Sequence, residues 1–145
     1  MRRLVLGLPL LLASLPVTSS PAWAQPRPFN CIGAERLRED VAVVTFARGA
    51  DRVAPEAVAV MQPLAVLARE APARNFCVLG FASSNEGGAQ SGSRLAARRA
   101  RAVGLELAKM GIERDRVRAE ARIRGFASTG VDRRAGARIV LLPVQ

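Results

Sequence analysis

The feature that most constrains the fold is a nearly continuous apolar run from Asn75 to Phe81. A run of strand length without polar alternation is typical of a strand covered on both faces, so it predicts the centre of a sheet. The β-branched run from Val41 to Phe46 predicts a second strand, which ends before Gly49. A buried central strand requires neighbouring strands beside it and helices or loops over its faces.

Two segments with helical spacing accompany these strands. The first begins at Pro55, a residue that suits the first position of a helix. Its apolar or small residues recur at helical spacing: Ala57, Met61, Leu64, Ala65 and Ala68. The second segment is longer and ends at Gly111, because a glycine suits the end of a helix. Its stripe consists of Leu95, Arg99, Ala100, Val103 and Leu107.

The C-terminal part of the chain predicts two more strands. Val117 to Arg124 alternates strictly, which is typical of a strand with one exposed face. Gly125 to Gly136 is expected to be a loop, and Ala137 to Val144 a last strand. The order strand, helix, strand, helix, strand, strand predicts an α+β fold. We expect a two-layer α/β sandwich of the split βαβ kind, with a mixed sheet and two helices on one face.

The N-terminus has the pattern of a secretory signal peptide. Arg2 and Arg3 supply a positive start, a leucine-rich core follows from Leu4 to Leu15, and Ala22-Trp23-Ala24 gives a cleavage signal. The alternative is an uncleaved membrane anchor, but the core has about 12 residues where a membrane-spanning helix needs roughly 20. We therefore expect a signal peptide over residues 1–24, an N-terminal extension over residues 25–39 and a folded domain over residues 40–145.

Export sets the surroundings of the two cysteines. We expect the mature protein in the periplasm, without a membrane span, in association with the cell wall or the outer membrane. Disulfides persist outside the cytoplasm, so Cys31 and Cys77 are predicted to form a bridge. The bridge would tie the N-terminal extension to the central strand. The alternative is two independent, buried small apolar residues.

Composition excludes several kinds of site. The chain has no histidine, which excludes a serine–histidine–aspartate triad, a cysteine–histidine pair and a histidine-bound metal. Two cysteines are too few for a four-thiolate zinc or iron–sulfur site. The sole lysine, Lys109, lies near the end of a helix, where a cation needs no further role. We therefore expect no catalytic residue, no cofactor and no metal.

The net charge indicates the chemical class of the partner. Its value of +10 comes from 22 lysine and arginine residues against 12 aspartate and glutamate residues, and arginine carries nearly all of it. Guanidinium groups bind carboxylates and phosphates in a bidentate manner, so we expect an anionic partner. Nucleic acid fits poorly, because the chain after the signal peptide lacks tryptophan and tyrosine for stacking and is exported.

The segment from about Asp40 to Leu142 resembles the OmpA-like domain of bacterial envelope proteins. Residues 95–100 read Leu-Ala-Ala-Arg-Arg-Ala, where that family has Leu-Ser-x-x-Arg-Ala, and Gly111-Ile112 matches its Gly-Ile helix ending. Residues 80–83 read Gly-Phe-Ala-Ser at the loop where the family has Gly-aromatic/His-Thr-Asp. Residues 136–140 read Gly-Ala-Arg-Ile-Val at the place of its closing Asn-Arg-Arg-Val-Glu. The resemblance implies non-covalent binding of the peptidoglycan stem peptide.

The resemblance also implies which residues bind. In the family, the helix arginine pairs with the carboxylate of diaminopimelate and the loop aspartate supplies a negative group. Here Arg99 matches the arginine, while Ser83, or Ser84 if the extra loop residue is placed earlier, stands in place of the aspartate. Serine supplies no charge, and Glu86 is the nearest acidic substitute. Arg138 matches an arginine of the closing motif and would face the same groove. The alternative for both arginines is surface charge, on a solvated helix face and at a strand edge.

The sequence thus predicts a non-catalytic periplasmic domain that binds peptidoglycan or another anionic envelope polymer. The loss of the loop aspartate predicts weakened binding, because charge-assisted hydrogen bonds are about twice as strong as neutral ones. The alternative is that the same fold serves as a protein–protein interaction module with an envelope protein as its partner.

Overall fold

The computed structural model of the chain describes residues 27–83, 86, 88–122 and 136–144. The predicted signal peptide, Ser84 and most of the loop predicted between Gly125 and Gly136 lie outside these ranges.

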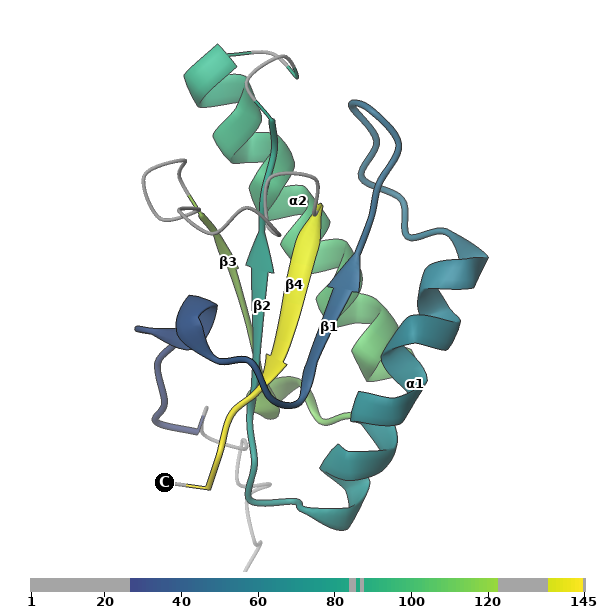
Figure 1. The fold of residues 1–145 in the computed structure, drawn as a ribbon, viewed down its shortest axis with the longest axis vertical. Helices are drawn as coiled ribbons and strands as arrows, with labels where there is room; N and C mark the ends of the chain where they lie inside the picture. Colours follow the sequence, from purple (N-terminus) through teal and green to yellow (C-terminus); the bar gives the residue numbers. More distant parts are fainter. Residues whose placement is uncertain (1–26, 84–85, 87, 123–135, 145) are drawn as a thin grey trace, which may run out of the picture.

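Within the described ranges, four strands form one mixed sheet (Figure 1). They are β1 (Val41–Val44), β2 (Phe76–Gly80), β3 (Val117–Ala121) and β4 (Ala137–Leu141), in the spatial order β1-β4-β2-β3. β4 is antiparallel to both β1 and β2, whereas β2 is parallel to β3. β2 is an interior strand and all its residues are buried, as its continuous apolar run predicts.

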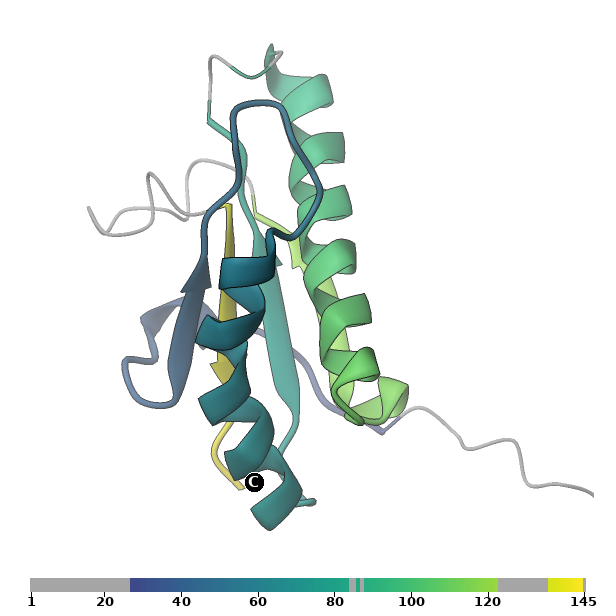
Figure 2. The ribbon, with the colours of Figure 1, turned by 90° about the vertical axis from the view of Figure 1, so that its right-hand side faces the viewer.

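The two helices are α1 (Pro55–Glu70) and α2 (Gly88–Lys109). A short 3-10 turn precedes each of two strands: η1 (Ala34–Arg36) lies before β1, and η2 (Arg114–Arg116) lies before β3. Figure 2 shows the helices against the sheet. A single apolar core joins them to it, with members that include Met61, Leu64, Phe76, Val78, Val103, Leu107, Ile139 and Leu141. The predicted α+β sandwich with a mixed sheet and two helices is confirmed. No helix in the described part of the chain combines the length and the apolar character needed to cross a membrane.

The N-terminal extension covers the other face of the sheet (Figure 1). Its residues Cys31 and Ala34 are buried against Leu79 and Val140, which point away from the helices. Cys31 and Cys77 form a disulfide with their Cα atoms 5.6 Å apart. The predicted bridge is confirmed, and it ties the extension to the central strand.

The close approach of β2 and α2 depends on Gly80. A Cβ atom at Gly80 would lie 1.9 Å from the carbonyl oxygen of Ala96 and 3.0 Å from the Cβ of Ala100. Because only glycine leaves room for a backbone at that distance, α2 packs directly on the end of β2. This contact sets the position of the helix turn between Ala96 and Ala100.

Arg116 is a buried arginine with a structural role that the sequence did not indicate. Its guanidinium is 2% exposed and donates to the carbonyl oxygens of Ala68, Ala71 and Arg74. Ala68 lies in the last turn of α1 and Ala71 ends the helix, where carbonyl groups lack helical partners. Arg116 also pairs with Glu113 at 3.0 Å. It therefore closes the C-terminal end of α1.

We expect the disulfide to contribute strongly to stability. Replacing Cys31 and Cys77 together by alanine should lower the free energy of unfolding by about 4 kcal/mol, because the bridge closes a separation of 46 residues and so restricts the unfolded chain. Urea unfolding of the oxidised wild type and the double variant measures the difference, and wild type under a reducing agent should match the variant. Two reactive thiols in denatured, unreduced wild type would contradict the bridge.

Candidate functional site

The candidate site is built around Arg99, which lies on the buried side of α2. Its neighbours Ala96 and Ala100 pack on the sheet, and Arg99 itself is only 3% exposed. A guanidinium group keeps its charge in proteins, so a buried one needs acceptors for all its N–H groups. This excludes the solvated helix face that composition alone offered for Arg99.

All five N–H groups of Arg99 have acceptors within the chain. Nε donates to the carbonyl oxygen of Ala50 at 2.8 Å, Nη1 to that of Phe81 at 3.0 Å, and Nη2 to that of Ala47 at 3.2 Å. The remaining N–H groups donate to the carboxylate of Glu86, from Nη1 to Oε2 at 3.1 Å and from Nη2 to Oε1 at 2.6 Å. Arg99 and Glu86 thus form a bidentate ion pair, and the Glu86 side chain is only 6% exposed.

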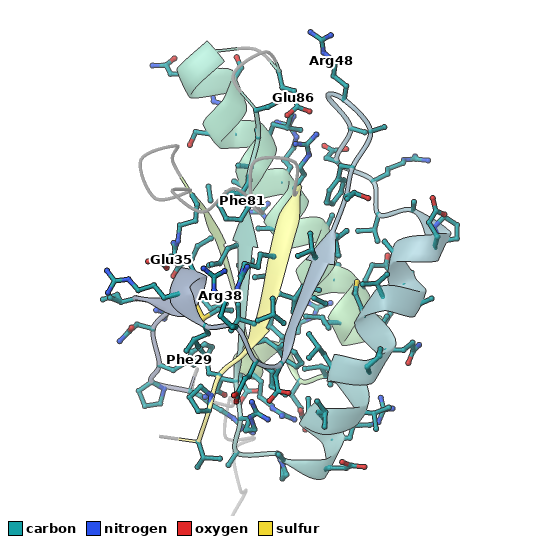
Figure 3. The ribbon with its side chains drawn as sticks, in the orientation of Figure 1. Phe29, Glu35, Arg38, Arg48, Phe81 and Glu86 are labelled. Atoms are coloured by element: carbon teal, nitrogen blue, oxygen red, sulfur yellow. A yellow bond between two sulfur atoms is a disulfide. The ribbon has the colours of Figure 1, made fainter. Side chains whose placement is uncertain are left out.

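The Glu86 carboxylate accepts from three further groups. Oε1 accepts the backbone N–H of Gly49 at 2.8 Å, and Oε2 accepts the backbone N–H and the hydroxyl of Ser83 at 2.7 and 2.8 Å. Figure 3 shows Glu86 between the beginning of α2 and the loop that carries Arg48. Gly49 has a φ of 71°, in the left-handed region that favours glycine. Together with Arg99, five donors surround one carboxylate.

These contacts hold the carboxylate in its charged form. The Arg99 guanidinium is the main cause that lowers the pKa of Glu86 well below its ordinary value of 4.5. Burial opposes this shift, and the N–H groups of Gly49 and Ser83 and the Ser83 hydroxyl lower the pKa further. The Glu86 carboxylate is therefore ionised at neutral pH.

The acidic group that faces Arg99 is Glu86, not the residue at the position of the family's aspartate. Ser83 donates to the same Glu86 carboxylate as Arg99, and Ser84 lies outside the described residues. The structure therefore brings three of the predicted site residues together, with Arg99 and Ser83 both donating to Glu86.

Arg138 lies on the face of the sheet away from α2. In the ladder between β2 and β4 it pairs with Leu79, whose side chain belongs to the apolar cluster under the N-terminal extension. Arg138 is buried and donates to the carbonyl oxygen of Leu37. The closing motif predicts that Arg138 faces the same groove as Arg99. This prediction is wrong, because the two arginines lie on opposite sides of the sheet.

Sequence reasoning missed the loop between β1 and α1, residues 45–54, as part of the site. This loop supplies the carbonyl groups of Ala47 and Ala50 and the N–H group of Gly49. It also places the ring of Phe46 5.2 Å from the guanidinium carbon of Arg99, a cation–π contact. Gly49, which follows an apolar strand, indicates a tight loop. The contacts of this loop with Arg99 and Glu86 use backbone groups, which the pattern of side chains does not reveal.

The site is a closed carboxylate-binding arrangement. A surface hollow lies nearby, between residues 51–53 and the C-terminal half of α2, but Arg99, Glu86 and Ser83 are not among its lining residues. In the described ranges, no three side chains of the metal-binding types lie together. What the geometry offers is a fixed guanidinium, backbone N–H groups and a hydroxyl around one carboxylate.

Comparisons relate this arrangement to known proteins. The model of the OmpA family matches residues 45–137, more than half of the chain. The matched segment includes Glu86, Arg99 and the loop between β1 and α1. No curated protein matches the sequence.

Solved structures share the fold with little sequence identity. The peptidoglycan-associated lipoprotein from Burkholderia pseudomallei has a TM-score of 0.56 and 19% identity, over 70% of this chain and 88% of that one. The OmpA-like domain of FopA1 from Francisella tularensis has a TM-score of 0.57 and 14% identity, over 75% and 79%. A MotB-like protein from Desulfovibrio vulgaris has a TM-score of 0.55 and 22% identity, over 70% and 71%.

The ion pair predicts a pH-dependent contribution to stability. The pKa of Glu86 is lower in the folded state than in the unfolded state, so its contribution is complete above the ordinary value of 4.5 and is lost as the pH falls below it. Glu86→Gln should therefore lower the free energy of unfolding by about 3 kcal/mol at pH 7, and by progressively less under acid. Urea unfolding from pH 7 to pH 3 measures this difference.

The matched control is Glu70→Gln, which makes the same change at an exposed position in the last turn of α1. This variant should stay within about 0.5 kcal/mol of wild type at each pH. A difference between wild type and Glu86→Gln that does not change with pH would contradict the ion pair.

Proposed function

Because this chain belongs to the OmpA family, we propose that it is a non-catalytic domain of the bacterial envelope that binds peptidoglycan. The ligand group is the carboxylate of the stem-peptide diaminopimelate, and Arg99 is the residue that pairs with it. The observation that carries this proposal is the bidentate ion pair of Arg99 with a carboxylate, at 2.6 and 3.1 Å, in a site where three segments converge.

The setting of the site supports the same proposal. One protein with this fold is described as a peptidoglycan-associated lipoprotein, and another is the periplasmic domain of Helicobacter pylori MotB. The signal peptide at residues 1–24 would bring this chain to the same compartment. In our proposal, residues 25–39 are an extension held by the disulfide and residues 40–145 are the binding domain.

The chemistry of the site supports binding without catalysis. Ser83 donates its hydroxyl hydrogen to Glu86, an arrangement that could activate a serine if the carboxylate were a good base. A carboxylate with a pKa well below its ordinary value accepts a proton poorly at neutral pH. Arg99 cannot act as a proton donor, because a guanidinium does not lose its proton in proteins.

One observation favours a second candidate function. Arg99 and Glu86 satisfy each other, so in this state neither group is available to a ligand. If the pair is permanently closed, the fold serves as a protein–protein interaction module with an envelope protein as partner. The two functions differ in whether the chain binds purified cell wall.

Sedimentation with purified sacculi at low salt tests the proposed function. Wild type should sediment with the sacculi, and free diaminopimelate should release it. The double variant Arg99→Ala with Glu86→Ala removes both buried charges together, so neither remains unpaired. It should bind at least about ten-fold more weakly, since a charge-assisted pair contributes roughly 1.5–3 kcal/mol.

The control is Arg118→Ala, which removes a positive charge from the exposed edge strand β3 and should leave sedimentation unchanged. Circular dichroism checks that each variant is folded. Wild type that stays in the supernatant at low salt would exclude peptidoglycan binding and favour the protein-interaction module.

A further inference from the structure

The donors of Arg99 are divided between the backbone and one carboxylate. The carbonyl groups of Ala47, Ala50 and Phe81 hold one N–H on each of the three nitrogens. The second N–H on each terminal nitrogen points to Glu86. The backbone therefore fixes the orientation of the guanidinium, and the two remaining N–H groups form a fork that matches any carboxylate.

The other donors at this position also come from residues other than Glu86. They are the N–H groups of Gly49 and Ser83 and the hydroxyl of Ser83, which lie 2.7 to 2.8 Å from the carboxylate oxygens. With the fork of Arg99, they form a receptor of five donors, which we call the carboxylate receptor. Glu86 supplies the carboxylate that fills this receptor but none of the five donors that form it.

We propose that Glu86 is an internal competitor of the ligand, and that its carboxylate fills the receptor that a ligand carboxylate enters on binding. This inference rests on the proposed function and adds that the described state is closed. Binding then exchanges one carboxylate for another at Arg99. Before and after the exchange each of the five donors has a carboxylate acceptor, whereas Glu86 loses all five of its donors.

Competition predicts an effect of Glu86 on ligand affinity opposite to the one expected if Glu86 were the acidic half of the ligand site. An acidic group that contacts the ligand would strengthen binding, whereas a competitor weakens it. The geometry favours competition, because all five donors of the receptor already donate to the Glu86 carboxylate and a ligand carboxylate would need the same donors. If one molecule in about ten is open at equilibrium, the apparent affinity is about ten-fold below that of the open site.

Removal of the competing carboxylate is the first test. Glu86→Gln places an amide NH2 group where an oxygen accepts N–H groups, so donors face donors and the side chain no longer fits the receptor. Glu86→Ala leaves the receptor empty. Both variants should bind purified sacculi about ten-fold more tightly than wild type at the same ionic strength. Glu70→Gln, with the same change of charge, should bind as wild type does.

Equal binding of wild type and both Glu86 variants would overturn the competition and leave the proposed function standing. Weaker binding of folded Glu86 variants would also overturn it, because Glu86 would then be a ligand contact.

A second test needs no peptidoglycan. Sodium acetate supplies a free carboxylate, which should enter the empty receptor of Glu86→Ala and raise its melting temperature by about 4 °C at ten times its Kd. Sodium chloride at equal ionic strength is the salt control. Wild type should respond much less than Glu86→Ala at the same acetate concentration, because acetate must displace Glu86 from the receptor.

The two tests separate the failure of each idea. If acetate stabilises Glu86→Ala and no form of the chain sediments with sacculi, the receptor filled by Glu86 is supported and the proposed function fails. If folded Glu86→Ala shows no response to acetate, the carboxylate receptor itself is wrong, whatever the sacculi show.

Discussion

The ion pair between Arg99 and Glu86 joins segments that are far apart in the sequence. Arg99 comes from α2 and Glu86 from the loop after β2, and backbone carbonyl and N–H groups of the loops after β1 and β2 surround them. The sheet and the two helices could pack by apolar contacts alone, but the arrangement of these loops depends on the pair. Removal of either partner leaves a buried charge uncompensated, which is one of the costliest changes that a folded protein can undergo.

The arginine excess acquires a different meaning from this arrangement. Arg99, Arg116 and Arg138 are all at most 3% exposed, and each donates to backbone carbonyl groups. They serve as internal connectors that tie helix ends and loops to the sheet, because the planar guanidinium reaches several acceptors at once. Part of the positive charge that indicated anionic partners is therefore buried, where it binds backbone carbonyl groups. The proposed binding depends on one buried arginine and its surroundings, not on the net charge.

Much of the architecture could be predicted from periodicity. The apolar run of β2 and the stripe of α2 determine which surfaces meet, and the expectation of export correctly predicted the bridge between Cys31 and Cys77. The face of Arg138 could not be predicted, because every residue of β4 is buried and a strand buried on both faces has no alternation to assign sides. Glu86 is the acidic residue nearest to the loop serines in the sequence. Its closure over Arg99 depends on loop backbone geometry, which the sequence pattern does not encode.

The closed site and the proposed exchange both depend on the charge state and location of the Glu86 carboxylate. Carbon-13 NMR of the side-chain carboxyl carbons, followed as the pH is lowered, measures the pKa of each glutamate in the folded protein. The Glu86 signal should remain that of an ionised carboxylate as the pH falls through the ordinary glutamate value of 4.5, because Arg99 lowers the pKa of Glu86. A Glu86 signal that titrates near the ordinary value of 4.5 would show that the carboxylate is not held by Arg99, and would contradict both the closed site and its internal competitor.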